Sequence, residues 1–266
     1  PISLEMWFVA WIGGGVFRHR FCAVPDTRES EVPMNAVPAR PVSGDPGTAT
    51  GRTATNRAVT VLALLASFAA VEHGVGEILQ GSGAPESVVI ESWPDSPAFS
   101  ALNGEPALTI LPDMVLAGVV TIAVALALAV YALGLAHRRH GGAGLLGLAL
   151  LLLLVGGGFG PPLLLIILAA ALLRPVASLR ASGEVRQWLA DRWRLLLAVT
   201  VAAYLGLFPG TVLLYSVAGV NSAGLVTVLM VTAFAGLLLT LVAARAHDGQ
   251  RFLEGEASLR DESPRG

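Results

Sequence analysis

The chain contains no lysine, one cysteine and few charged side chains. Without lysine it has neither the phosphate-binding lysine of a P-loop nor a Schiff-base nucleophile. The single cysteine, Cys22, excludes an intrachain disulfide and therefore a secreted disulfide scaffold. Charged residues make up 14% of the 266 residues, against about 25% in soluble domains. The net charge of −2 argues against a nucleic-acid partner, which would require a basic surface.

Familiar catalytic motifs are absent as well. The sequence has neither the G-x-S-x-G elbow of serine hydrolases nor the H-E-x-x-H helix of zinc proteases. No complete nucleophile or metal constellation is visible, so an enzyme is the least favoured interpretation. Cofactors and metals stay unknown at this point, because no motif specifies one.

Apolar residues are abundant and occur in long runs. Hydrophobic residues make up 54% of the sequence, and the mean hydropathy is +0.69. A hydrocarbon layer about 30 Å thick requires roughly 20 helical residues, because each residue adds about 1.5 Å. Uninterrupted runs of this length lie at 58–79, 108–136, 195–218 and 223–244. A further run, 143–173, is interrupted in its middle.

The interruption consists of residues that break a helix: Gly156, Gly157, Gly158, Gly160, Pro161 and Pro162. Glycine loses more entropy when ordered, and proline lacks the amide donor. Each half of the run is too short for a full crossing, so we predict a hairpin of two short helices, with one long kinked span as the alternative. The predicted fold class is an all-α, polytopic transmembrane helical bundle with four full spans plus one broken helical hairpin. Such a break also exposes backbone groups that channels and transporters use to contact substrates.

The arginines indicate how the spans are oriented. The loop 81–107 contains four acidic residues and no arginine, whereas Arg57 precedes the first span and Arg138 follows the second. By the positive-inside rule, this loop faces outward and both termini are cytoplasmic. A hairpin at 143–173 returns the chain to the cytoplasmic side, where more arginines follow. The all-arginine, alanine-rich composition is typical of a GC-rich genome, so we expect a bacterial plasma membrane.

The chain divides into three predicted parts. Residues 1–57 are expected to be a disordered N-terminal extension, 58–245 the transmembrane domain and 246–266 a cytoplasmic tail. Residues 1–33 are either extra residues ahead of a natural start at Met34 or part of a genuine extension. Within the transmembrane domain, 183–194 predicts a surface helix with Trp188 and Trp193 at the interface, and Pro209 predicts a kink in the span that follows.

Ionisable residues inside the first two spans are the candidate functional residues. Glu72, His73 and Glu77 lie near the outer end of the first span, and Asp113 lies early in the second at a similar depth. His73 and Glu77 share a helix face because they are four residues apart. We expect these four side chains to form one polar site for a proton relay, a divalent cation or a polar ligand. The alternative is a helix end at the wet interface, with His73 paired to Glu77 and Glu77 acting only as a solvated cap.

Two segments, 72–81 with the pattern EHGxGE and 156–162 with the sequence GGGFGPP, resemble segments of a family of uncharacterised bacterial multi-span membrane proteins. The resemblance covers about residues 58–245 and implies a membrane bundle, but no activity, ligand or partner. We predict a small transporter or channel-like element with an outer-leaflet polar site. The alternative is a non-catalytic accessory or scaffold protein. The expected partners are the lipid bilayer and either further copies of the chain or another membrane subunit.

Overall fold

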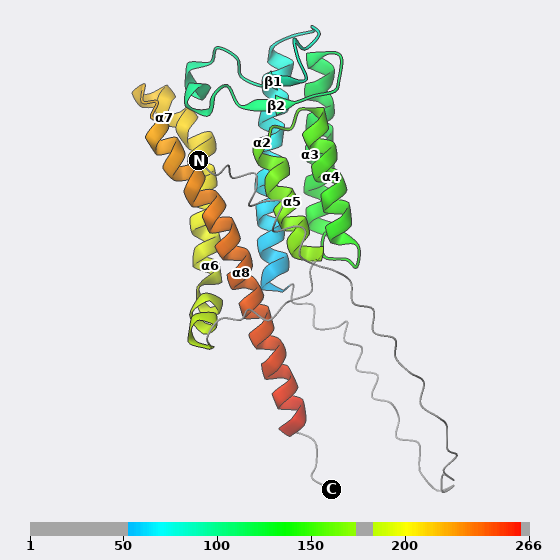
Figure 1. The fold of residues 1–266 in the computed structure, drawn as a ribbon, viewed down its shortest axis with the longest axis vertical. Helices are drawn as coiled ribbons and strands as arrows, with labels where there is room; N and C mark the ends of the chain where they lie inside the picture. Colours follow the sequence, from blue (N-terminus) through cyan, green and yellow to red (C-terminus); the bar gives the residue numbers. More distant parts are fainter. Residues whose placement is uncertain (1–52, 174–182, 262–266) are drawn as a thin grey trace, which may run out of the picture. The chain divides into compact units, whose positions relative to one another are not determined.

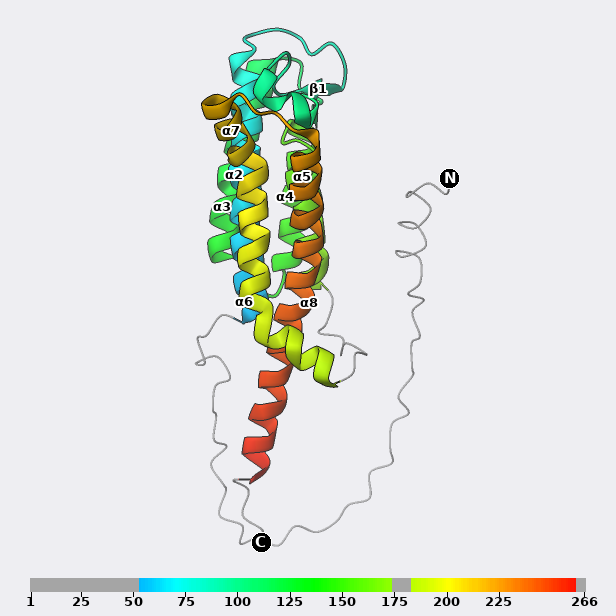
Figure 2. The same ribbon diagram turned by 90° about the vertical axis from the view of Figure 1, so that its left-hand side faces the viewer.

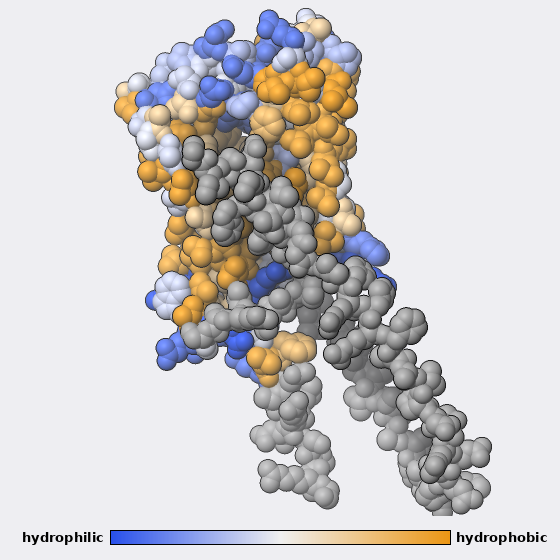
Figure 3. All heavy atoms as spheres, viewed as in Figure 1, coloured by the Kyte–Doolittle hydropathy of each residue, from blue (hydrophilic) through white to orange (hydrophobic). Residues whose placement is uncertain are grey.

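The computed structural model describes residues 53–173 and 183–261. Residues 1–52 of the predicted N-terminal extension lie outside the described ranges. The fold is an all-α helical bundle, as predicted (Figure 1). Within the described residues, four helices are long and apolar enough to cross a membrane: Ala54–Leu79, Met114–Gly134, Gly183–Ala218 and Ala223–Gly255. The protein is therefore membrane-embedded, and Figure 3 shows apolar side chains on the flank of the bundle and hydrophilic ones towards its two ends.

Helix α2 (Ala54–Leu79) is the helix around which the others gather. It contacts α3 (Met114–Gly134), the hairpin helix α5 (Gly160–Leu173), α6 (Gly183–Leu205) and α8 (Ala223–Asp261). Its buried face is rich in alanine, which lets neighbouring backbones approach closely. The backbones of α2 and α3 approach closely at Gly74 and Gly118, where a Cβ added to Gly74 would lie 2.7 Å from the carbonyl oxygen of Gly118.

The interrupted apolar run forms the predicted hairpin. Its helices are α4 (Gly141–Val155) and α5 (Gly160–Leu173), which pack along each other and against α3 and α2. Helix α4 ends at Gly156, whose φ of +119° is unfavourable for residues with a side chain. The alternative of one long kinked span is therefore wrong. With 15 residues, α4 is about 22 Å long, less than a membrane thickness.

The last two long helices pair with each other. Helix α6 (Gly183–Leu205) continues through a π-helical turn, η2 (Gly206–Gly210), into α7 (Thr211–Ala218), and it packs along α8 (Ala223–Asp261) (Figure 2). The predicted kink is present, because Phe208 beside Pro209 leaves the helical conformation with φ −148° and ψ 126°. Proline cannot donate to the helix ladder, so the α-helix is broken at this point.

One expectation about this pair needs correction, and both of its helices extend beyond the apolar runs. Residues 183–194 are helical and run without a break into the span that follows, as the first part of α6. Trp188 is exposed there, but Trp193 is buried against Ala54 and Ala58 of α2. The predicted tail from 246 is helical as far as Asp261, because α8 continues past the apolar run. This continuation is stabilised by Asp248, whose carboxylate accepts the amides of the first two residues of α2 at 2.7 and 2.9 Å.

A folded loop covers one end of the bundle, which we call the loop end, where residues 80–113 lie (Figure 1). It contains strand β1 (Val89–Glu91), the 3-10 helix η1 (Pro97–Leu102) and strand β2 (Pro106–Leu108). The two strands pair antiparallel, with Ile90 opposite Ala107. The turn of the hairpin lies at the same end, because the Ile110 amide donates to the Leu154 carbonyl at 3.0 Å.

Candidate functional site

The last turns of α2 carry three ionisable side chains into the interior at the loop end. Glu72 is 9% exposed, His73 5% and Glu77 0%. These low exposures arise because the folded loop lies over the end of α2 and the hairpin turn lies beside it. The interpretation of Glu77 as a solvated cap is therefore wrong.

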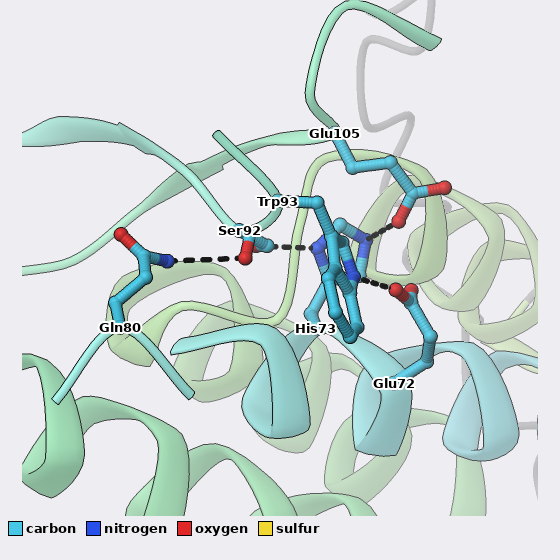
Figure 4. A network of polar contacts seen from close by, with 6 residues as sticks. All are labelled: Glu72, His73, Gln80, Ser92, Trp93 and Glu105. Atoms are coloured by element: carbon cyan, nitrogen blue, oxygen red, sulfur yellow. Dashed lines mark hydrogen bonds and ion pairs between the residues drawn. The ribbon is translucent and has the colours of Figure 1, made fainter. Parts of the chain in front are cut away.

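The loop supplies the polar partners of these residues (Figure 4). His73 Nδ1 lies 2.8 Å from the hydroxyl oxygen of Ser92, and His73 Nε2 lies 3.4 Å from a carboxylate oxygen of Glu105. The indole N–H of Trp93 donates to the carboxylate of Glu72. His73 is therefore paired with loop residues and not, as the alternative interpretation had it, with Glu77.

An unusual backbone turn directs Glu105 inward. Asn103, Gly104 and Glu105 have consecutive positive φ values of +53°, +67° and +53°. This region is disfavoured for residues with a side chain, so the surrounding structure must stabilise it. Gly104 also lies close to Glu91, since a Cβ on Gly104 would lie 2.6 Å from a carboxylate oxygen of that side chain.

Glycines let the loop and the hairpin turn approach α2. A Cβ on Gly76 would lie 2.8 Å from the indole of Trp93, so Gly76 makes room for that ring. A Cβ on Gly158 would lie 2.5 Å from His73 Cε1, and one on Gly156 would lie 2.6 Å from a carboxylate oxygen of Glu77. The hairpin turn therefore lies directly against the imidazole of His73 and the carboxylate of Glu77.

Asp113 does not join this cluster. Its carboxylate accepts the amide of Leu116 at 2.9 Å and caps the first turn of α3. A carboxylate in this position stabilises a helix N-terminus, which explains why an acidic residue follows a proline here. Glu105 takes the place that the sequence interpretation assigned to Asp113.

Sequence reasoning missed the loop residues Ser92, Trp93 and Glu105. The only available signal was the cluster of acidic residues in the loop, which does not reveal which one turns inward.

Carboxyl groups outnumber basic side chains at the site. Among the described residues, Glu105 forms an ion pair with His73. Neither carboxylate oxygen of Glu77 has a hydrogen-bond donor in the same part of the chain. Helices α2 and α4 both end here, and a helix C-terminus carries roughly half a negative charge. One atom each from Glu72, His73 and Glu105 lie within 4.8 Å of one another, so these residues could hold a metal ion.

The fold and the site define a helical membrane protein with a buried acidic cluster beneath a folded loop. Comparisons with protein-family models, curated proteins and solved structures found no match. The functional argument therefore depends on the site itself.

Proposed function

We propose that this protein is a small transporter or channel-like element that takes up cations from the outer face of a bacterial plasma membrane. The observation that carries the proposal is the burial of two carboxyl groups and one histidine within the bundle, beside the carboxylate of Glu105, which is 13% exposed, without an arginine partner among the described residues. A buried charge is costly unless it is paired, and ionisable groups at membrane depth mark ion or proton pathways.

The orientation is supported by the placement of basic residues. In the described residues, arginines lie at the opposite end of the bundle from the loop, where α2 and α6 begin and α3 and α8 end: Arg57, Arg138, Arg139, Arg186, Arg192, Arg194, Arg245 and Arg251. By the positive-inside rule that end is cytoplasmic, and the loop end faces outward.

Access to the site is expected from the outer side. Towards the cytoplasmic end, α2 is surrounded by an apolar core that includes Leu62, Leu128 and Leu165. An ion cannot pass such a core without rearrangement of the helices. The α4–α5 hairpin is the element best suited to move, because its helices are short and its turn contacts the site directly.

The test is cation flux into proteoliposomes that contain the purified full-length chain. One internal dye reports protons and a second reports divalent ions, with protein-free liposomes as background. We expect flux above that background in the wild-type protein and at background in Glu72→Gln. Glu86→Gln is the matched control, because Glu86 is an exposed carboxylate of the same loop end and should leave flux unchanged.

A wild-type protein that moves neither protons nor divalent ions would refute the transport assignment. That outcome favours the accessory class, in which the apolar flanks of the bundle pack against a partner membrane subunit.

A further inference from the structure

We propose that Glu72, His73 and Glu105 bind a divalent transition-metal ion of the manganese, iron and zinc group. This inference rests on the proposed function, because it names the class of cation that the same site takes. Carboxylate oxygen and imidazole nitrogen together suit these ions, whereas magnesium and calcium prefer oxygen ligands alone.

The distances in the cluster fit such an ion. His73 Nε2 and the Glu105 carboxylate oxygen are 3.4 Å apart. Two ligands on bonds of about 2.1 Å around a tetrahedral ion are separated by about 3.4 Å, so this pair already has the required spacing. A ligand atom of Glu72 lies within 4.8 Å of both, which a small side-chain rotation would shorten to the same value.

The ligands are held by partners of the kind that metal sites use. His73 Nδ1 is bonded to the hydroxyl of Ser92 at 2.8 Å, which leaves Nε2 facing Glu105. A hydrogen bond to the non-coordinating nitrogen selects the tautomer and orients the ring. The Trp93 indole N–H holds the carboxylate of Glu72 in the same way.

A separate observation at the same helix end also points to a cation. Glu77, one turn beyond His73, is fully buried, and its two carboxylate oxygens have no donor in the described residues. An unpaired buried carboxyl group is unfavourable in its charged form, and a dication bound close by would favour that form. Glu72 and Glu105, deprotonated on metal binding, balance a charge of +2 by themselves, so Glu77 need not coordinate the ion.

An acidic pocket lies beside the site. A pocket of about 290 Å³ at the loop end is lined by Glu91, Asp95 and Gly104, and by the Trp93 ring. The indole N–H of the same ring donates to Glu72. Trp93 therefore contacts both an acidic pocket, which attracts cations, and one of the buried ligands. Its ring is held in place by stacking on Phe99, with centroids 4.7 Å apart.

The experiment measures metal binding by the detergent-purified full-length chain, stripped of metal and then equilibrated with Mn²⁺ or Zn²⁺. Bound metal is counted after gel filtration, and Co²⁺ is used as a spectroscopic probe, because its visible absorption reports nitrogen and oxygen coordination. We expect about one ion per chain in the wild-type protein, which is one per three-ligand site. Binding should be lost in His73→Gln and Glu105→Gln and unchanged in Glu86→Gln.

A second variant separates a binding role from a folding role. Trp93→Phe keeps an aromatic ring that can stack on Phe99 but removes the donor to Glu72, so we expect metal affinity to fall about tenfold while the gel-filtration profile stays unchanged. Wild-type protein that binds neither Mn²⁺ nor Zn²⁺ at millimolar concentration overturns the inference. Binding that survives in both His73→Gln and Glu105→Gln also overturns it.

The metal inference and the proposed transport fail in different ways. Metal bound in detergent without flux in liposomes supports the metal site and refutes transport. Proton flux in liposomes without metal binding refutes the metal site and supports transport.

Discussion

Replacement of Glu77 by methionine should stabilise the metal-free protein. Glu77 is fully buried and its carboxylate oxygens have no hydrogen-bond donor among the described residues. A buried polar group without a partner costs about 1 to 3 kcal/mol. Methionine has a similar length, no polar group to satisfy and a flexible side chain that fits irregular space beside Gly156. We therefore expect Glu77→Met to raise the free energy of unfolding by about 1 to 3 kcal/mol.

Thermal unfolding in detergent, followed by tryptophan fluorescence, measures this change. Thr121→Val is the matched control, because Thr121 is equally buried but its hydroxyl donates to the Val155 carbonyl at 2.8 Å. Loss of that bond should lower stability by about 0.5 to 1.5 kcal/mol. The two substitutions should thus shift the melting temperature in opposite directions. If Glu77→Met lowers it as Thr121→Val does, Glu77 has a stabilising partner and the reasoning is wrong.

Three further predictions concern the hairpin turn, the start of α2 and the orientation. Gly158→Ala should lower the melting temperature, because Gly158 has a φ of +72° and a Cβ there would lie 2.5 Å from His73 Cε1. Gly160→Ala is the control and should be neutral, because a Cβ at Gly160 would meet nothing within 4 Å. Asp248→Ala removes the acceptor of the first two amides of α2, and hydrogen exchange in that turn should report a loss of about 0.5 to 2 kcal/mol. In a Cys22→Ser background, Phe159→Cys should react with an impermeant maleimide in intact cells, since Phe159 is 42% exposed at the loop end; reaction only after permeabilisation would reverse the orientation.

The helical spans and the hairpin could be predicted because their signals are local. A run of about 20 apolar residues has one favourable arrangement in a bilayer, and glycines followed by prolines end a helix in any surroundings. The kink at Pro209 has the same origin. The extent of α8 could not be predicted in this way, since composition marks where a helix leaves the membrane and not where it ends. Residues 246–261 stay helical in a polar segment, and Asp248 there binds the start of α2.

The choice between Asp113 and Glu105 depends on long-range structure. Both are acidic residues near the same end of the bundle. The sequence favours Asp113 as the partner of His73, because Asp113 lies early in the second predicted span at a similar depth. The carboxylate of Asp113 instead accepts an amide of the first turn of its own helix, α3, which needs such an acceptor. Glu105 reaches His73 only because three successive residues adopt positive φ, and two of these, Asn103 and Glu105, are not glycine. No local pattern predicts that turn, since the contacts that stabilise it come from α2 and the rest of the loop.

The two sequence motifs, EHGxGE and GGGFGPP, pack against each other in the structure. His73 and Glu77 are one helical turn apart on α2, or about 6 Å along its axis. Gly158 and Gly156 are two residues apart in the hairpin turn, where the Gly158 amide donates to the Gly156 carbonyl at 2.8 Å. Each glycine faces one of the two side chains, and a Cβ at either position would meet it. One glycine in the left-handed conformation, Gly156, is sufficient to end α4. The second glycine with positive φ, Gly158, therefore allows the turn to lie close to His73. Movement of the hairpin turn would therefore alter the surroundings of His73 and Glu77 together, which is the coupling that a transport cycle requires.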